Sequence, residues 1–199
     1  RSLEHIKWLK ENFQNVKSYE VDLTETFAAF RSTLPTEARD PLALANLQSR
    51  LRMCALYSFA NSNGFLVAGT GNKVEDYGIG FFTKYGDGGV DLNPIADLLK
   101  SEVYDLASTL GVSENILSAH PTDGLWQDNR TDEDQIGASY AELEWALKFS
   151  DRGGVPEMVS GRKKDVLLLY RQRNRNNRHK LNTAPVCYMP QEWKDNEEF

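Results

Sequence analysis

A short apolar run, FLVAG at residues 65–69, leads directly into a stretch that holds six glycines in twenty residues. The run has the length and composition typical of a strand that is buried on both faces of a parallel sheet. The stretch that follows, TGNKVEDYGIGFFTKYGDGG at 70–89, also carries four aromatic side chains. Four aromatic side chains are not typical of a flexible linker, and six glycines are not typical of a core strand. We therefore expect this stretch to close around a ligand at the end of a strand.

Helix-like and strand-like segments alternate along the chain. Apolar residues at helical spacing predict helices within 2–14, 25–34 (capped by Thr24), 42–61, 93–111, 131–149 and 161–180. Strands are predicted at 16–23, where apolar and polar residues alternate, and at 65–69. This order predicts an α/β fold, namely a Rossmann-like, three-layer parallel sheet flanked by helices. We expect one domain over residues 1–199.

Composition narrows the class of protein. With 40% hydrophobic and 26% charged residues, the chain is expected to be globular, and no apolar run approaches the ~20 residues of a membrane span. The net charge of −6 argues against a surface built for nucleic acid. Cys54 and Cys187 lie on apolar stretches without metal-ligand spacing. Two reduced, buried thiols are expected, which points to the cytoplasm.

The start of the glycine-rich stretch suits a phosphate. A turn that leaves a strand at Gly69-Thr70-Gly71 exposes backbone N–H groups, although a tight turn without a ligand needs the same residues. Glu75 follows closely and is a candidate Mg²⁺ ligand, because Mg²⁺ takes one or two carboxylates together with substrate phosphates. The alternative for Glu75 is a solvated surface acid.

The second half of the stretch offers stacking and charge. Phe81 and Phe82 are adjacent, so in an extended segment one can join the core while the other faces a planar ring. Lys84 suits an anionic group of a ligand, and Asp87 or Asp91 suits hydroxyls or an ammonium-like group. The alternatives are two core phenylalanines and an ordinary solvated loop.

Further candidates lie on predicted helices. Asn46 and Arg50 are four residues apart and share a helix face, and an arginine fork fits carboxylates and phosphates. Lys100 opens a helix, where phosphates bind readily, and Thr122 follows a His-Pro pair. Surface, turn and capping roles are the alternatives for these residues. The basic run at 171–180 lacks interleaved aromatics, so we interpret it as charge that complements a helix C-terminus.

Several segments together resemble one enzyme family. The segments NLQSRLRMCALY, GTGNKVE, GFFTKYGDGGVDLNPIADLLK, PTDGLW and TDEDQIGASYAELEWAL, within 46–147, closely resemble ammonia-dependent NAD⁺ synthetase of the N-type ATP pyrophosphatase superfamily. The resemblance implies an adenine nucleotide alpha hydrolase-like fold. It also implies a carbon–nitrogen ligase that adenylates the carboxylate of deamido-NAD⁺ with ATP and displaces AMP with ammonia, releasing pyrophosphate.

The resemblance also implies roles for individual residues. The residues implied to contact deamido-NAD⁺ are Asn46, Arg50, Phe81, Lys84, Asp91, His179 and Lys180. Those implied to contact ATP are Thr70, Lys100 and Thr122, while Glu75 is implied to bind Mg²⁺. Asp87 is expected to help place ammonia beside the adenylate, which makes Asp87 and Lys100 the catalytic candidates. The family further implies a cytoplasmic homodimer with the dinucleotide site at its interface, and the helix within 42–61 is the candidate dimer element.

One family motif is absent from these residues. Family members carry an SGGxDS loop that cradles the pyrophosphate of ATP, and residues 1–199 contain no SGG. We therefore expect the N-terminal strand and loop to be missing here. The alternative functions are another ATP-pyrophosphatase-type ligase, a catalytically dead nucleotide-binding or dimerisation module, and an RNA-binding protein that uses the run at 171–180.

Overall fold

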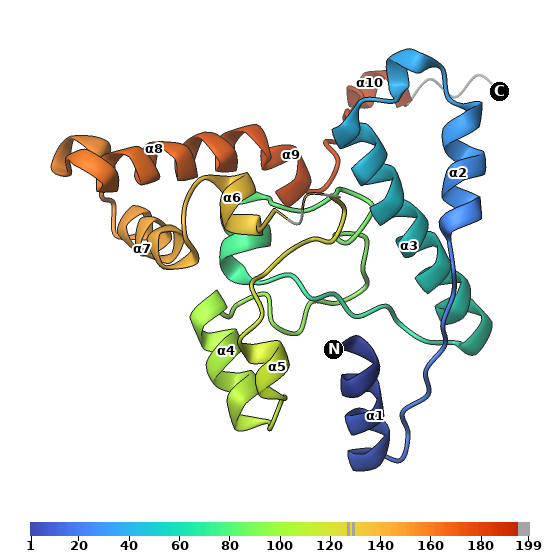
Figure 1. Cartoon of the computed structure of the whole chain (residues 1–199). Coiled ribbons are helices and arrows are strands. Elements are labelled where there is room, and N and C mark those ends of the chain that lie inside the picture. Colours follow the sequence, from blue (N-terminus) through green and yellow to red (C-terminus); the bar gives the residue numbers. More distant parts are fainter. Residues whose placement is uncertain (127, 129, 195–199) are drawn as a thin grey trace.

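The computed structural model describes residues 1–126, 128 and 130–194, and it is built mainly from helices (Figure 1). The α-helices are α1 (Ser2–Asn12), α2 (Thr24–Thr33), α3 (Pro41–Asn63), α4 (Lys100–Thr109), α5 (Glu114–Leu117), α6 (Asp132–Ile136), α7 (Tyr140–Asp151), α8 (Gly161–Asn176), α9 (Arg178–Leu181) and α10 (Gln191–Lys194). Shorter turns are η1 (Thr36–Ala38), η3 (Pro156–Met158) and the π-helical turn η2 (Lys73–Ile79).

The core lies where α7, α8 and η2 meet. It is formed by Val74, Ile79, Leu99, Ile136, Ala138, Leu143, Ala146, Leu147, Val166, Leu167 and Tyr170. Both α7 and α8 pack against η2, so the middle of the glycine-rich stretch is part of the core. Figure 1 shows α2 and α3 side by side, apart from α7 and α8, with the segment that follows α3 running between the two groups.

The predicted strands are wrong for the described residues. Residues 16–23 contain no strand, and the run at 65–69 makes only an isolated parallel bridge between Ala68 and Leu92. Phe65 and Leu66 are 68% and 70% exposed rather than buried on two faces. A strand is stabilised by neighbouring strands, and in the described chain this run has backbone hydrogen bonds only to Asp91 and Leu92 beyond its own helix end. The predicted three-layer sheet is therefore not confirmed.

Most predicted helices are confirmed, with corrected ends. The N-cap of α3 is Asp40, whose carboxylate accepts from two backbone N–H groups, and Gly64 ends the helix with a φ of 65°. Thr24 is the first residue of α2 rather than its cap, because Leu23 occupies the cap position. The predicted helix at 161–180 is interrupted by Asn177, which separates α8 from α9.

The predicted helix at 131–149 is two helices. Thr131 caps α6, but Gly137 then adopts a φ of 89° and ends it. Ser139 caps α7 by accepting a hydrogen bond from the N–H of Glu142. The left-handed glycine turns the chain, so that α7 can pack on α8.

The predicted burial of both cysteines is also wrong. Cys54 and Cys187 are exposed and unpaired. Cys54 lies on α3, whose buried residues are Ala45, Ser49 and Ala60, so the buried face of this helix is made of small side chains and does not include the cysteine. Within the described part of the chain, none of the helices combines the length and apolar character that crossing a bilayer demands.

Candidate active site

A cavity of about 150 Å³ opens beside the first half of the glycine-rich stretch. It is lined by Thr70, Gly71, Glu75, Asp76, Phe81, Asp87, Asp123 and Asp132. Five of these eight residues are acidic, so the cavity is suited to cations or to ligands that bring cations with them. Glu75 and Asp76 of the lining come from η2, while Asp132 is the first residue of α6 and Asp123 lies in the loop before it.

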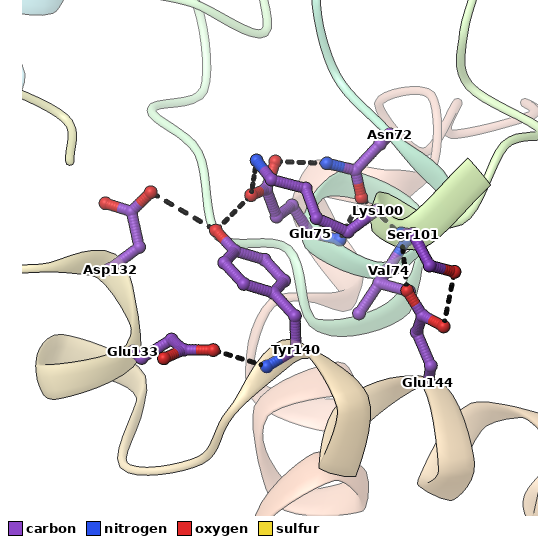
Figure 2. Close-up of polar contacts among 9 residues, drawn as sticks. All are labelled: Asn72, Val74, Glu75, Lys100, Ser101, Asp132, Glu133, Tyr140 and Glu144. Carbon is purple, nitrogen blue, oxygen red and sulfur yellow. Dashed lines mark hydrogen bonds and ion pairs between the residues drawn. The ribbon is translucent and has the colours of Figure 1, made fainter. Parts of the chain in front are cut away.

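Glu75 is the most constrained carboxylate of the cavity. Asn72 caps η2 by accepting hydrogen bonds from the N–H groups of Val74 and Glu75, both at 3.0 Å, and its side-chain amide donates to the Glu75 carboxylate. The ammonium of Lys100 lies 2.8 Å from the same carboxylate (Figure 2). The Lys100 and Glu75 side chains are 18% and 14% exposed, so this ion pair is largely shielded from water.

Tyr140 links Glu75 to the opposite wall of the cavity. Its hydroxyl lies between the carboxylates of Glu75 and Asp132, and it can donate its one proton to either (Figure 2). Burial, together with the charge of Glu75, raises the pKa of Tyr140 above its usual value, so the hydroxyl keeps its proton. Burial also raises the pKa of Asp132, and the charge of Glu75 adds to the effect.

Helix α7 positions both members of the Glu75–Lys100 pair. Tyr140 and Glu144 lie four residues apart and therefore share one face of α7. Glu144, which is buried, accepts from the backbone N–H and the hydroxyl of Ser101, at 2.8 and 2.9 Å. These bonds hold the first turn of α4, from which Lys100 reaches Glu75 and lies 4.7 Å from the Tyr140 ring centre.

Asp76 is a cavity carboxylate whose side chain makes no hydrogen bond or ion pair with the described residues. Burial, and then the charges of Glu75 and Asp87, raises the pKa of Asp76 to about 7. Its carboxylate occupies the space that a side chain at residue 71 would need, because a Cβ on Gly71 would lie 1.8 Å from an Asp76 oxygen. The glycine of the GTG turn thus makes room for an acid as well as leaving backbone exposed.

Helix α3 holds one side of the glycine-rich loop. The hydroxyl of Thr83 donates to Asn46 at 2.7 Å, and Arg50 donates to the Lys84 carbonyl at 3.2 Å. Ser49 donates to Asp87 at 2.7 Å and accepts from the Asp87 N–H at 3.0 Å. The helix face that carries Asn46 and Arg50 therefore contacts the loop, as their shared spacing suggested. Ser49 lies between these two residues in the sequence and was not predicted to take part.

The C-terminal helices hold the other side. Lys180 donates to the carbonyls of Gly80 and Phe82 at 2.9 and 2.6 Å, and Lys84 donates to the His179 carbonyl at 2.5 Å. Burial lowers the pKa of Lys180. In this structure both ammonium groups are thus bonded to backbone carbonyls, where the sequence suggested anionic ligand groups.

The two phenylalanines separate, but not as predicted, because the ring that reaches the cavity is also the one that packs against the core. Phe81 lines the cavity and also packs against the core. Phe82 lies over Gly88, where a Cβ would come within 2.3 Å of its ring, and beneath the ammonium of Lys180 at 5.3 Å. One aromatic ring therefore faces the cavity while its neighbour packs against the loop.

Two predicted residues have other partners here. Asp91 accepts from the N–H of Val67 at 2.7 Å and from the hydroxyl of Tyr57 at 3.0 Å, so it joins the loop to the end of α3. The Thr122 hydroxyl donates to the carbonyl of Arg130 at 3.3 Å and accepts from the N–H of Gly124. Its neighbour Asp123 is the residue of this turn that lines the cavity.

The structure thus gathers the predicted residues in two groups. Thr70, Glu75, Phe81 and Asp87 line the cavity, and Lys100 joins them through Glu75. The second group surrounds the glycine-rich loop and consists of Asn46, Arg50, Lys84, His179 and Lys180. Sequence reasoning missed Asp76, Asp123, Asp132 and Tyr140. The last two lie within the segment TDEDQIGASY, so the motif was noticed but not its side chains.

The cavity fits a divalent cation that arrives with a ligand. Among the described residues, no three His, Cys, Asp or Glu side chains are grouped closely enough to hold a metal by themselves. However, Asp132 is 8% exposed, and its Oδ1 atom has no hydrogen-bond partner in the described chain. An unpaired buried carboxylate oxygen beside Glu75 suits Mg²⁺, which is usually held by one or two carboxylates plus phosphate oxygens.

Comparison with known proteins agrees with this geometry. The family model described as NAD synthase matches residues 1–184. The NH(3)-dependent NAD(+) synthetase of Methanosarcina mazei is 40% identical over 170 residues, which are 83% of this chain and 66% of the relative. The enzyme of the same name from Archaeoglobus fulgidus is 53% identical over 112 residues, or 56% of this chain and 44% of the relative.

Solved structures give the same class. NMN synthetase from Francisella tularensis has a TM-score of 0.76 at 32% identity, covering 94% of this chain and 71% of that protein. The NH3-dependent NAD synthetase from Campylobacter jejuni, solved with a nitrate ion, has a TM-score of 0.65 at 25% identity over 84% of this chain and 64% of that protein.

The similar proteins are all named as synthetases of NAD or NMN. The chain belongs to the NAD synthase family. It spans about two thirds of the length of the Methanosarcina mazei relative and less than half that of the Archaeoglobus fulgidus relative. The fold of this family is consistent with the predicted adenine nucleotide alpha hydrolase-like class.

Proposed function

We propose that the protein to which these residues belong is an ammonia-dependent NAD⁺ synthetase. The observation that carries the proposal is the acidic cavity, which joins Phe81 of the glycine-rich loop to the Glu75–Lys100 ion pair in a chain of the NAD synthase family. A planar ring on Phe81 and a phosphate near Lys100 would lie on opposite sides of one small space.

The proposed reaction has two steps. A carboxylate oxygen of deamido-NAD⁺ attacks the α-phosphorus of ATP, and the bond to pyrophosphate breaks. Ammonia then attacks the carboxyl carbon, the bond to AMP breaks, and the amide of NAD⁺ forms as the nitrogen loses a proton. Neither step needs a covalent nucleophile, so the protein's contribution is to position the reactants, neutralise phosphate charge and exclude water.

The residues divide between the two substrates. We assign Phe81 to the nicotinate ring, and the residues around the loop to the remainder of deamido-NAD⁺: Asn46, Arg50, Lys84, Asp91, His179 and Lys180. Thr70, Lys100 and Thr122 are assigned to ATP. Asp87 lines the cavity with its carboxylate fixed by Ser49, and we assign it to placing ammonia.

Glu75 and Asp132 are the residues that would hold Mg²⁺. Bound there with ATP, the ion would supply positive charge against the phosphate oxygens. Lys100 pairs with Glu75, so a cation that replaces it there would free the ammonium for a phosphate. The unpaired Oδ1 of Asp132 supports the same assignment.

The domain organisation, the sheet, the localisation and the oligomeric state are further proposals. We propose one domain with the parallel three-layer sheet of the adenine nucleotide alpha hydrolase-like class, since the Ala68–Leu92 bridge is parallel. We propose a cytoplasmic homodimer in which α3 lies at the interface, since Leu56 and Phe59 on this helix are 56% and 37% exposed.

A second candidate substrate follows from the structural comparison. The Francisella tularensis neighbour is named an NMN synthetase, and it covers more of this chain, at higher identity, than the Campylobacter jejuni NAD synthetase. The same chemistry applied to nicotinate mononucleotide would yield NMN. The two candidates differ only in whether the acceptor carries the second nucleotide.

One assay tests both candidates. The natural gene product, with its intact mass measured first, is supplied with Mg-ATP, ammonium and either deamido-NAD⁺ or nicotinate mononucleotide. We expect NAD⁺ from the first acceptor, with one AMP and one pyrophosphate per turnover and a kcat/KM at least tenfold above that for the mononucleotide. A reversed preference would favour the NMN synthetase. AMP release without either product would indicate another ligase, and no turnover would leave a binding or dimerisation module.

A further inference from the structure

Two asparagines, Asn174 and Asn177, lie at the C-terminal end of α8. Their side chains are uncharged, so an interaction with the helix dipole does not account for their positions. Asn174, Asn177 and Lys180 follow one another at intervals of three residues, so they lie along one face of the α8–α9 segment. Their donors all meet the backbone of the glycine-rich loop, almost 100 residues earlier in the chain.

The three side chains bind successive carbonyl groups. Asn174 donates to the carbonyl of Gly78 at 2.7 Å, and Asn177 donates to that of Ile79 at 2.8 Å. Lys180 then donates to Gly80 at 2.9 Å. The two asparagine side chains thus satisfy carbonyls at the end of η2, where helical hydrogen bonding stops.

The close fit at Gly80 shows that this contact is specific to the loop's backbone shape. Gly80 has a φ of 64°, and a Cβ there would lie 2.5 Å from the Cβ of Asn177. A glycine at this position allows both the left-handed turn and the close approach of Asn177. The residue that follows is Phe81, whose ring lines the cavity.

We propose that Asn174 and Asn177 are positioning residues for the acceptor substrate, an inference that rests on the proposed function of the cavity. They fix the turn at Gly78–Gly80, and this turn sets the direction in which Phe81 leaves the core. A glycine-rich loop has few side chains with which to hold itself, so its geometry is supplied by donors from α8. Their loss releases Phe81 from the ring-binding position while leaving Glu75 and Lys100 in place.

The test replaces the donors without changing side-chain size. Asn177→Asp and Asn174→Asp keep the shape but put a carboxylate where an N–H donor faces a carbonyl. Asn176→Asp is the matched control, since it makes the same charge change on an exposed side chain of the same helix. In the natural protein we expect each of the two test variants to raise the KM for deamido-NAD⁺ about tenfold, with the KM for ATP within twofold of wild type.

A second readout does not depend on turnover. Backbone amides of residues 78–84 should exchange with deuterium faster in Asn177→Asp than in Asn176→Asp, while amides of α7 exchange equally in both. Equal exchange at 78–84 would overturn the proposal, because Asn177 would then not hold the loop. KM values that rise equally for both substrates would also overturn it, because a merely structural role would give that pattern. If wild type makes neither NAD⁺ nor NMN, the proposed function fails, and the exchange comparison still decides whether these asparagines hold the loop.

Discussion

Tyr140 has one proton and two carboxylates that could receive it. At the scale of single residues, this lack of hydrogen-bond donors distinguishes the cavity from an ordinary buried network, in which each acceptor has its own donor. Glu75 is compensated by Lys100 and Asn72, whereas among the described residues the Asp132 carboxylate is bonded only by the Tyr140 hydroxyl, and its second oxygen has no partner. Removing the hydroxyl should therefore harm the Asp132 side of the cavity more than the Glu75 side.

Tyr140→Phe tests this directly. We expect the KM for Mg-ATP to rise about tenfold, because an isolated carboxylate loses its orientation when its donor is removed, while the KM for the acceptor stays within twofold. Tyr170→Phe is the control, since Tyr170 is also buried and its hydroxyl bonds to no described residue. Steady-state kinetics of both variants provide the measurement, and equal effects of the two would contradict the role of the Tyr140 hydroxyl.

The sequence located individual site residues where they lie close together in the chain. Thr70, Glu75, Phe81 and Asp87 fall within eighteen positions and do line one cavity. Tyr140 was missed because it meets Glu75 across 65 positions. A tyrosine that opens an amphipathic helix looks like a core residue, and only the folded chain shows which carboxylates its hydroxyl meets.

At the scale of elements, helices were predictable and strands were not. Helical spacing is a local property, so α1, α2 and α3 appear close to their expected bounds, while α4 is a shorter helix within 93–111. A strand depends on partners elsewhere, and the run at 65–69 makes one bridge, to Leu92. The break between α6 and α7 was missed because Gly137 lies inside an apolar periodicity that continues on both sides.

Gly137→Ala tests that break. Gly137 has a φ of 89°, which costs a residue with a Cβ about 1–2 kcal/mol, while the space itself is adequate because the nearest atom to a Cβ would lie 3.5 Å away. We expect the free energy of unfolding to fall by about that amount in chemical denaturation. Gly137→Asn should cost less, since asparagine tolerates the left-handed region. Equal stability of Gly137→Ala and wild type would show that the turn relaxes.

At the scale of the whole molecule, the contact between α7 and α8 should shape acid stability. Glu142 pairs with Arg162 at 2.7 Å, and hydrogen bonds from Arg162 are the main reason that the pKa of Glu142 falls to about 2. A carboxyl whose pKa is lower in the folded state stabilises the protein above its unfolded pKa of about 4.5. This stabilisation is lost as the pH falls toward 2.

Glu142→Gln removes the charge but keeps an oxygen to accept from the Ser139 N–H, so the cap of α7 survives. We expect the variant to be less stable than wild type by well under 1 kcal/mol at pH 6, because the pair is partly exposed. The difference should shrink as the pH is lowered from 4.5 toward 2. Denaturation curves at several pH values measure it, and a constant difference would mean that the ion pair contributes nothing.

The anchoring of the glycine-rich loop has a mechanical consequence. One end of the loop, at Thr83–Asp87, is hydrogen-bonded to three side chains of α3, namely Asn46, Ser49 and Arg50. Its other end is hydrogen-bonded to α8 and α9. The loop therefore connects α3 to the α8–α9 segment through hydrogen bonds at both of its ends. Thr83, which bonds to α3, is two residues from Phe81. We therefore expect a displacement of α3, for example when another surface binds its exposed Leu56 and Phe59 side chains, to change the shape of the cavity.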